Sequence, residues 1–133
     1  MLGYAAMAAI FAQMKWIMLV SGLLTSTMVH AAISPQAALQ STFGGQLEGP
    51  LAEIVVRNWG ALIALVGGMV IYGAFRPATR PLVLTVAALS KIVFISLVLI
   101  YGYARGQAAI AIAIDSVMVA IFTAYLLASP SHQ

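Results

Sequence analysis

The chain has 133 residues, of which 63% are hydrophobic and only 7% are charged, whereas soluble domains are near 45–50% apolar and about 25% charged. This composition excludes a water-soluble fold, and six basic and three acidic residues are too few for the basic surface that nucleic-acid binding needs. The absence of cysteine excludes disulfide exchange and thiolate metal sites, and two histidines do not supply an intramembrane metal or haem site.

The first apolar run is too long to be assigned to a single membrane span in a simple way. It covers residues 16–33 and is closed by Ser34-Pro35, since proline disfavours the helical conformation in the residue before it. Residues 1–13 are also apolar, and one helix through both would be about 50 Å long against a hydrocarbon core of about 30 Å. We therefore interpret 1–13 as a tilted or interfacial extension, or as sequence upstream of a true start at Met14.

A cleaved signal peptide is an alternative interpretation of the same run. Lys15 would be its basic segment, residues 17–28 its apolar segment and residues 29–31 a cleavage site with small side chains. Against it, the apolar run continues to Ile33 and the basic segment carries a single charge. We predict a four-span membrane domain at residues 14–128 and a short tail at 129–133.

The polar stretch at residues 34–50 separates the first span from the second. Gly44-Gly45 and Gly49-Pro50 within it are turn signals, and residues 35–43 could form a short helix on the membrane surface, with proline in its first turn. At roughly 20 residues per span, the rest of the chain holds three more. The predicted fold is all-α, an integral membrane four-helix bundle with one short polar loop. The later spans are predicted from residue 51 or 54 to 75, at 82–103 and at 108–128.

The basic residues that flank the spans indicate orientation. Lys15, Arg76 and Arg80 fall on one side of the membrane and Arg105 falls on the other. We therefore predict that both termini are cytoplasmic and that the loop at 34–50 faces the periplasm or the cell exterior. The expected location is a bacterial inner membrane, where the chain would be a multi-pass protein.

Ionisable groups inside the spans are the best candidates for function, because each costs roughly 2.5–3.5 kcal/mol at the bilayer centre. Lys91 and Asp115 each lie twelve residues from Tyr103, beside the turn between the third and fourth spans. Equal path lengths place both groups at the same depth, about 18 Å from the turn. We predict a facing Lys91–Asp115 pair, which either locks the hairpin or takes part in proton transfer or ligand binding.

A second charged pair lies early in the second span. Glu53 and Arg57 are spaced i and i+4 in the acid-before-base order that helices prefer. Their face continues through Gly60, Ala64 and Gly68, a small-residue pattern that permits close packing of membrane helices. The pattern predicts that the pair points into the bundle, either as a satisfied structural pair or as part of a polar site.

His30 lies about one turn from the outer end of the first span. It is either a capping or interfacial residue or a group for binding or proton transfer. All four spans thus contribute to one predicted polar pocket, which opens to the outer face under the loop. Its predicted residues are His30, Glu53, Arg57, Lys91 and Asp115.

One short motif is similar to that of a known family. Val56-Arg57-Asn58-Trp59-Gly60 leads a glycine-rich second span, after a polar loop with Phe43-Gly44 and a first span that ends near a proline. This arrangement resembles the small four-helix bacterial DoxX-like membrane proteins over roughly residues 14–128. The resemblance implies a four-helix membrane fold, and some proteins of that group look like membrane subunits of quinone-linked sulfur oxidation or oxidative-stress complexes. Arg57 and Gly60 are its local match, and it offers no catalytic residue.

Three functions are compatible with these features. The first is a non-catalytic membrane component that binds a small lipophilic or anionic ligand, such as a quinone, or that anchors a partner complex or a second copy of itself. The second is a proton-coupled small-molecule transporter that uses Lys91 and Asp115, although the first-span glutamate of small multidrug exporters is missing here. The third is an intramembrane lipid or sterol isomerase. It ranks last, because acid–base catalysis needs a carboxyl group that readily takes up a proton, whereas Asp115 is predicted to face the positive charge of Lys91.

Overall fold

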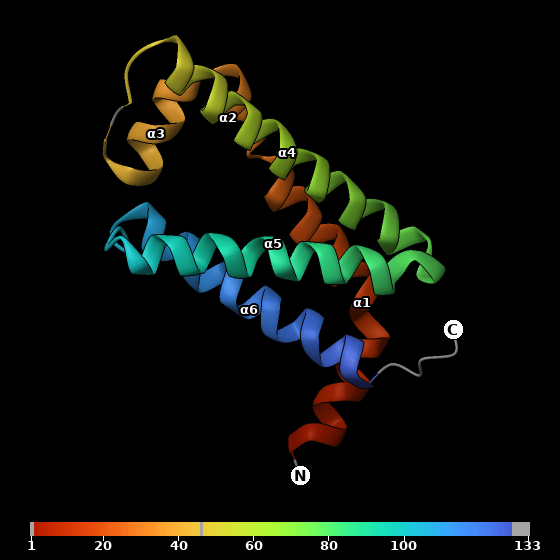
Figure 1. The fold of residues 1–133 in the computed structure, drawn as a ribbon. Helices are drawn as coiled ribbons and strands as arrows, with labels where there is room; N and C mark the ends of the chain where they lie inside the picture. Colours follow the sequence, from red (N-terminus) through yellow and green to blue (C-terminus); the bar gives the residue numbers. More distant parts are fainter. Residues whose placement is uncertain (1, 46, 129–133) are drawn as a thin grey trace.

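The computed structural model describes residues 2–45 and 47–128, so the predicted tail at 129–133 lies outside the described residues. The described part is an all-α bundle with four helical segments long and apolar enough to cross a membrane. This confirms the predicted fold class and marks the chain as a membrane protein. The elements in Figure 1 are α1 (Leu2–Ser26), α2 (Val29–Ile33), α3 (Pro35–Phe43), α4 (Pro50–Phe75), the 3₁₀ turn η1 (Pro77–Thr79), α5 (Arg80–Ile100) and α6 (Gln107–Ala128).

The first span consists of two helices with a break between them. α1 ends at Ser26, and a turn at Thr27 and Met28 leads into α2. The hydroxyl groups of Thr25 and Thr27 donate to the carbonyls of Ser21 and Leu24, at 2.8 and 2.5 Å. Hydroxyl side chains that bond back to the preceding turn bend helices. The helix predicted over residues 16–33 is therefore interrupted near its C-terminal end.

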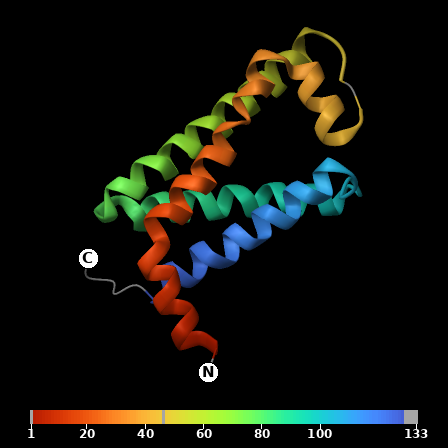
Figure 2. The ribbon, with the colours of Figure 1, turned by 180° about the vertical axis from the view of Figure 1, so that it is seen from behind.

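The apolar residues before Met14 continue α1 without interruption. The segment long and apolar enough to cross a membrane begins at Ala5. The ring of Phe11 stacks on that of Tyr125 in α6, with centroids 4.7 Å apart, so this part of α1 packs beside the end of α6 (Figure 2). Met14 itself is fully buried in the core.

Close packing of α4 against α1 and α2 depends on two glycines. A Cβ atom added at Gly67 would lie 2.6 Å from the amide nitrogen of Ser26 and 2.8 Å from the carbonyl oxygen of Gly22. One added at Gly60 would lie 2.7 Å from Cβ of Ala31. Neither position can therefore accept a larger side chain without a shift of backbone.

The predicted packing stripe of Gly60, Ala64 and Gly68 is wrong at Gly68, where an added Cβ would meet nothing within 4 Å. Each residue turns an α-helix by about 100°, so two steps of four residues rotate the stripe by about 80° away from its starting face. Seven residues return to within about 20° of it. The face that packs on α1 consequently passes through Gly67, and Ala64 is half-buried between the two.

Arg80 closes the other end of α4. Its guanidinium group donates to the carbonyl oxygens of Gly73 (2.9 Å) and Ala74 (3.0 Å) and to the hydroxyl of Tyr125 (3.3 Å). The last carbonyls of a helix have no partner within it, and a cation there also interacts favourably with the helix dipole. Arg80 is thus a buried cap that joins α4, α5 and α6, in addition to the flanking charge that the sequence predicted.

The turn between α5 and α6 begins earlier than predicted. α5 ends at Ile100, and Gly102 adopts a left-handed conformation with φ of 73°. The amide of Tyr103 then bonds to the carbonyl of Val98 at 2.9 Å, the hydrogen bond of a Schellman C-cap. Glycine is favoured at this position because it lacks the Cβ that penalises the left-handed conformation.

The bundle is closed at one end and splayed at the other. Its largest buried side chains, which include Met18, Leu84 and Phe122, form an apolar core near the α4–α5 turn. From there α4 and α5 diverge, and α3 lies across the wide end opposite the α5–α6 turn (Figure 1). Seen from behind, α1 and α6 diverge in the same direction (Figure 2). This divergence creates the space for a site.

Candidate functional site

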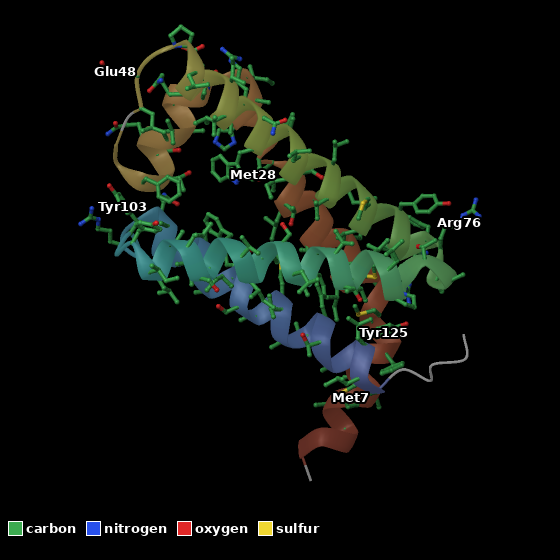
Figure 3. The ribbon with its side chains drawn as sticks, in the orientation of Figure 1. Met7, Met28, Glu48, Arg76, Tyr103 and Tyr125 are labelled. Atoms are coloured by element: carbon green, nitrogen blue, oxygen red, sulfur yellow. The ribbon has the colours of Figure 1, made fainter. Side chains whose placement is uncertain are left out.

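A cavity of about 330 Å³ lies between the diverging helices. Its walls come from α1, α4, α5 and α6, and Ser41 and Thr42 of α3 lie at its wide end. Met28 faces this space from the turn after α1, and Tyr103 lies beside the near end of α3 (Figure 3). Most of the lining surface is apolar, although nine of the eighteen lining residues have polar side chains. The placement of these polar groups decides what the cavity can bind.

The strongest polar group in the cavity wall is an ion pair halfway along the α5–α6 hairpin. Nζ of Lys91 lies 3.0 Å from Oδ1 of Asp115, and the two side chains are 9% and 20% exposed. The sequence predicted this facing pair from equal path lengths to the turn, and the structure confirms the pairing. Both residues line the cavity.

Lys91 has a second partner that the sequence analysis missed. Its Nζ donates to Oγ1 of Thr25 at 3.2 Å, and that hydroxyl in turn donates to the carbonyl of Ser21 at 2.8 Å. The hydroxyl proton is therefore directed to α1, which leaves a lone pair for Lys91. A pair of hydroxyl residues at i and i+4 in an apolar span was the available signal. The contact ties α1 to the α5–α6 hairpin at the level of the ion pair.

The ammonium group of Lys91 has fewer hydrogen-bond partners among the described residues than it has donors. An ammonium carries three N–H groups, and within the part of the chain that the structure describes, Nζ donates to two acceptors, Asp115 and Thr25. Asp115 balances the charge, and its carboxylate can accept further hydrogen bonds. The site therefore offers one donor and one acceptor without a net charge of its own.

Trp59 and Phe94 line the cavity and belong to a group of four aromatic side chains. The rings of Trp59 in α4 and Phe94 in α5 are stacked, with centroids 6.4 Å apart and an angle of 18°. Phe43 at the end of α3 lies 6.3 Å from Trp59 and 6.5 Å from Phe94, and meets Tyr103 edge-on at 6.0 Å. We call these four residues the aromatic cluster. It connects α3 to both arms of the splayed bundle.

His30 is the third predicted residue that lines the cavity. It lies in α2 near the wide end, where its side chain is exposed and Nδ1 is 2.8 Å from the carbonyl oxygen of Thr27. It holds the turn that separates α1 from α2. Gln107, at the start of α6, is a further polar residue of the lining.

Glu53 and Arg57 are absent from the cavity lining, and the prediction that they point into the bundle is wrong. They form an ion pair at 3.6 Å with side chains 47% and 46% exposed. Nη1 of Arg57 donates to the carbonyls of Ala32 (2.6 Å) and Ile33 (3.2 Å). The guanidinium group thus caps the end of α2 at the outside of the bundle, where unpaired carbonyls attract it more than the apolar interior does.

The structure therefore brings together three of the five predicted residues: His30, Lys91 and Asp115. Among the described residues, no three His, Asp or Glu side chains are grouped so as to hold a metal ion. Comparison with family models, with curated proteins and with solved structures gives no match to this chain. The case for a function consequently depends on the cavity itself.

Proposed function

We propose that this chain is a non-catalytic membrane protein that binds a small, planar, lipophilic ligand with carbonyl groups, such as a quinone, in the cavity of the splayed bundle. The observation that carries the proposal is the remaining donor of Lys91 in a mostly apolar cavity. A ligand carbonyl that accepts this hydrogen bond gains the strength of a charged donor, and the stacked rings of Trp59 and Phe94 provide a flat apolar wall for a ring.

The charge balance favours a neutral ligand over an anion. An anion near Lys91 would also lie within a few ångströms of Asp115, whose carboxylate is 3.0 Å from the same ammonium. In a membrane interior that repulsion is weakly screened. A neutral carbonyl avoids it, and a hydroxyl on the same ring can donate to Asp115. The pair is thus complementary to both the carbonyl and the hydroxyl form of a quinone.

We further propose that the chain is a DoxX-like protein of a bacterial inner membrane with cytoplasmic termini, so that the cavity opens to the outer side. Nζ of Lys15 lies 5.0 Å from the ring centre of Phe75, beside Arg76, which supports a common basic end for these residues. Arg105 lies on the opposite turn. A partner complex or a second copy of the chain remains part of the proposal, with the lipid bilayer as its surroundings.

The experiment uses the two tryptophans. Trp59 lines the cavity and Trp16 does not, so the Trp16→Phe variant in lipid nanodiscs reports on the cavity alone. A water-soluble benzoquinone without a tail should quench Trp59 saturably. Lys91→Met should weaken binding by about tenfold or more, the loss expected for a charged hydrogen bond. Ser96→Ala, at an exposed position of α5 outside the cavity, should not change it.

Quenching that rises linearly without saturation, or that is equal in Lys91→Met, would overturn the proposal. A folding defect is separated from a binding defect by the double variant Lys91→Met/Asp115→Leu, which removes both charges together. It should remain folded in a thermal unfolding assay and still bind weakly. If it binds as tightly as the parent, Lys91 is not the ligand's partner.

A proton-coupled transporter is the second candidate, and one observation favours it. The apolar core of Met18, Leu84 and Phe122 lies on one side of the ion pair, and the cavity lies on the other. A transporter in one of its two states would have such a one-sided cavity. Proton uptake into proteoliposomes should then depend on Asp115, and an unchanged signal in Asp115→Asn would remove this candidate.

A further inference from the structure

A groove between α1 and α6 adjoins the cavity. It is lined mainly by apolar side chains, among them Trp16 and Val20 of α1 and Val117 of α6. Ile114 and Met118 line the groove as well as the cavity, so these two side chains form the threshold between the two spaces. Figure 2 shows α1 and α6 diverging from their crossing.

The groove faces the surroundings of the bundle. Val20 and Val117 are 56% and 59% exposed, and both belong to segments apolar enough to cross a membrane. The hydroxyl of Ser21 is turned away to the carbonyl of Met18 at 3.2 Å. Along α1 the groove extends from Ser21 to Gln13, which is about 12 Å at 1.5 Å per residue. It is an open apolar depression that begins at Ile114, next to Asp115, and faces lipid along α1 and α6.

We propose that the ligand is an amphiphile with a single apolar tail, such as an alkyl or isoprenoid chain, whose ring occupies the cavity and whose tail lies in the groove between α1 and α6. This inference rests on the proposed function and adds the class of ligand. A compact ligand would leave the groove to bilayer lipid, whereas a tailed ligand fills cavity and groove at once. Continuity at Ile114 and Met118 favours the tailed ligand.

The tail contributes selectivity more than affinity. A chain that leaves the bilayer for the groove exchanges lipid contacts for protein contacts, so little hydrophobic free energy is gained. The groove instead selects ligands by the shape of their tail. A bulky side chain placed in it should therefore obstruct a tail and leave the cavity intact. Val20 and Val117 suit this purpose because they line the groove and not the cavity.

The test compares two ligands in groove variants, with Trp59 as the reporter in the Trp16→Phe background. We expect Val20→Phe and Val117→Phe to weaken binding of a benzoquinone with a decyl tail about tenfold. They should leave the tailless benzoquinone within about twofold. Val93→Phe, at an exposed position of α5 outside cavity and groove, is the matched control.

A second measurement does not depend on how well those variants fold. In the Trp59→Phe variant, Trp16 reports on the groove, and a decyl tail with a terminal bromine should quench it saturably. The double variant Lys91→Met/Asp115→Leu, which should remain folded, should weaken the saturable part about tenfold or more, because the head loses its charged hydrogen bond. Unspecific quenching from the bilayer has no such dependence on Lys91.

The two proposals fail in different ways. If the tailless benzoquinone binds and depends on Lys91, but the groove variants affect both ligands equally or neither, the tail is not in the groove and the inference is overturned. Bilayer lipid in the groove would give that result. If the tailless benzoquinone does not bind at all, the proposed function itself is overturned.

Discussion

Nζ of Lys91 and Oδ1 of Asp115 are 3.0 Å apart on facing helices, with Thr25 of a third helix as the second acceptor of the same ammonium. The cluster is at once a tie between α1 and the α5–α6 hairpin and the most polar part of the cavity. A purely structural pair would have its donors satisfied and be enclosed. Here the pair borders a cavity, and one N–H group of Lys91 has no partner among the described residues. The proposed ligand would accept this hydrogen bond.

Removing one charge of the Lys91–Asp115 pair should destabilise the protein more than removing both charges. Lys91→Met leaves a carboxylate within the membrane part of the bundle, and Asp115→Leu leaves an ammonium there; an unpaired buried charge costs about 3–5 kcal/mol. The double variant Lys91→Met/Asp115→Leu should recover most of the loss. Thermal unfolding in mild detergent measures all three. Losses that simply add in the double variant would mean that the two groups are not coupled.

Adjacent glycines of α4 should respond in opposite ways to alanine. Gly67→Ala pushes a Cβ against the backbone of Ser26 and Gly22 and should destabilise the protein by about 1–3 kcal/mol. Gly68→Ala meets no atom within 4 Å and should be neutral or stabilise the helix by up to about 1 kcal/mol. Denaturant unfolding in detergent gives both values. Equal losses at the two positions would contradict the observed face of α4.

Replacing Arg57 should destabilise α2 and the loop at residues 34–50, whereas replacing Glu53 should have little effect. Arg57→Met removes the cap from the carbonyls of Ala32 and Ile33, so α2 and the segment after it should open more often. Glu53→Gln removes only an exposed ion pair, which is worth at most about 1 kcal/mol. Limited proteolysis between residues 34 and 50 should accelerate several-fold in Arg57→Met alone. Equal acceleration in both variants would assign the effect to the ion pair.

The Phe43 side chain should slow dissociation of the ligand from the cavity. Its ring packs near those of Trp59 and Phe94, which line the cavity, and of Tyr103. Phe43→Ala removes these contacts. The dissociation rate of the tailless benzoquinone should rise about tenfold, with a smaller change in its association rate. Gln40→Ala, at an exposed position of α3, is the control. A dissociation rate that stays the same would exclude a role for the aromatic cluster in retention.

The ion pair could be predicted from sequence because it depends on chain length alone. Lys91 and Asp115 are the same number of residues from the turn, and an antiparallel hairpin must then place them level with each other. The four membrane-spanning segments follow from composition for a similar reason, since bilayer thickness fixes their length. Neither prediction requires knowledge of how side chains pack.

The remaining features depend on the exact rotation of each helix and on which of several groups a side chain contacts. A sequence pattern does not resolve either. Gly68 shares the spacing of Gly60 and Ala64, but the drift of the helix turns it outward and brings Gly67 to α1. Arg57 lies three residues before Gly60 on the same predicted face, yet the carbonyls at the end of α2 hold its guanidinium group outside the bundle. Thr25 becomes a site residue only through the depth at which α1 meets α5, which no local signal determines.

The most direct test of the account is to locate the ligand by crosslinking. A benzoquinone with a photoreactive azide is bound to the protein in nanodiscs and irradiated, and mass spectrometry of the digest identifies the labelled residues. The account predicts labels on the cavity wall at Trp59, Phe94 and Ile114, strongly reduced in Lys91→Met and blocked by excess unlabelled benzoquinone. Labels spread over lipid-facing residues such as Leu62, Leu65 and Ile100, and unaffected by Lys91→Met, would contradict it.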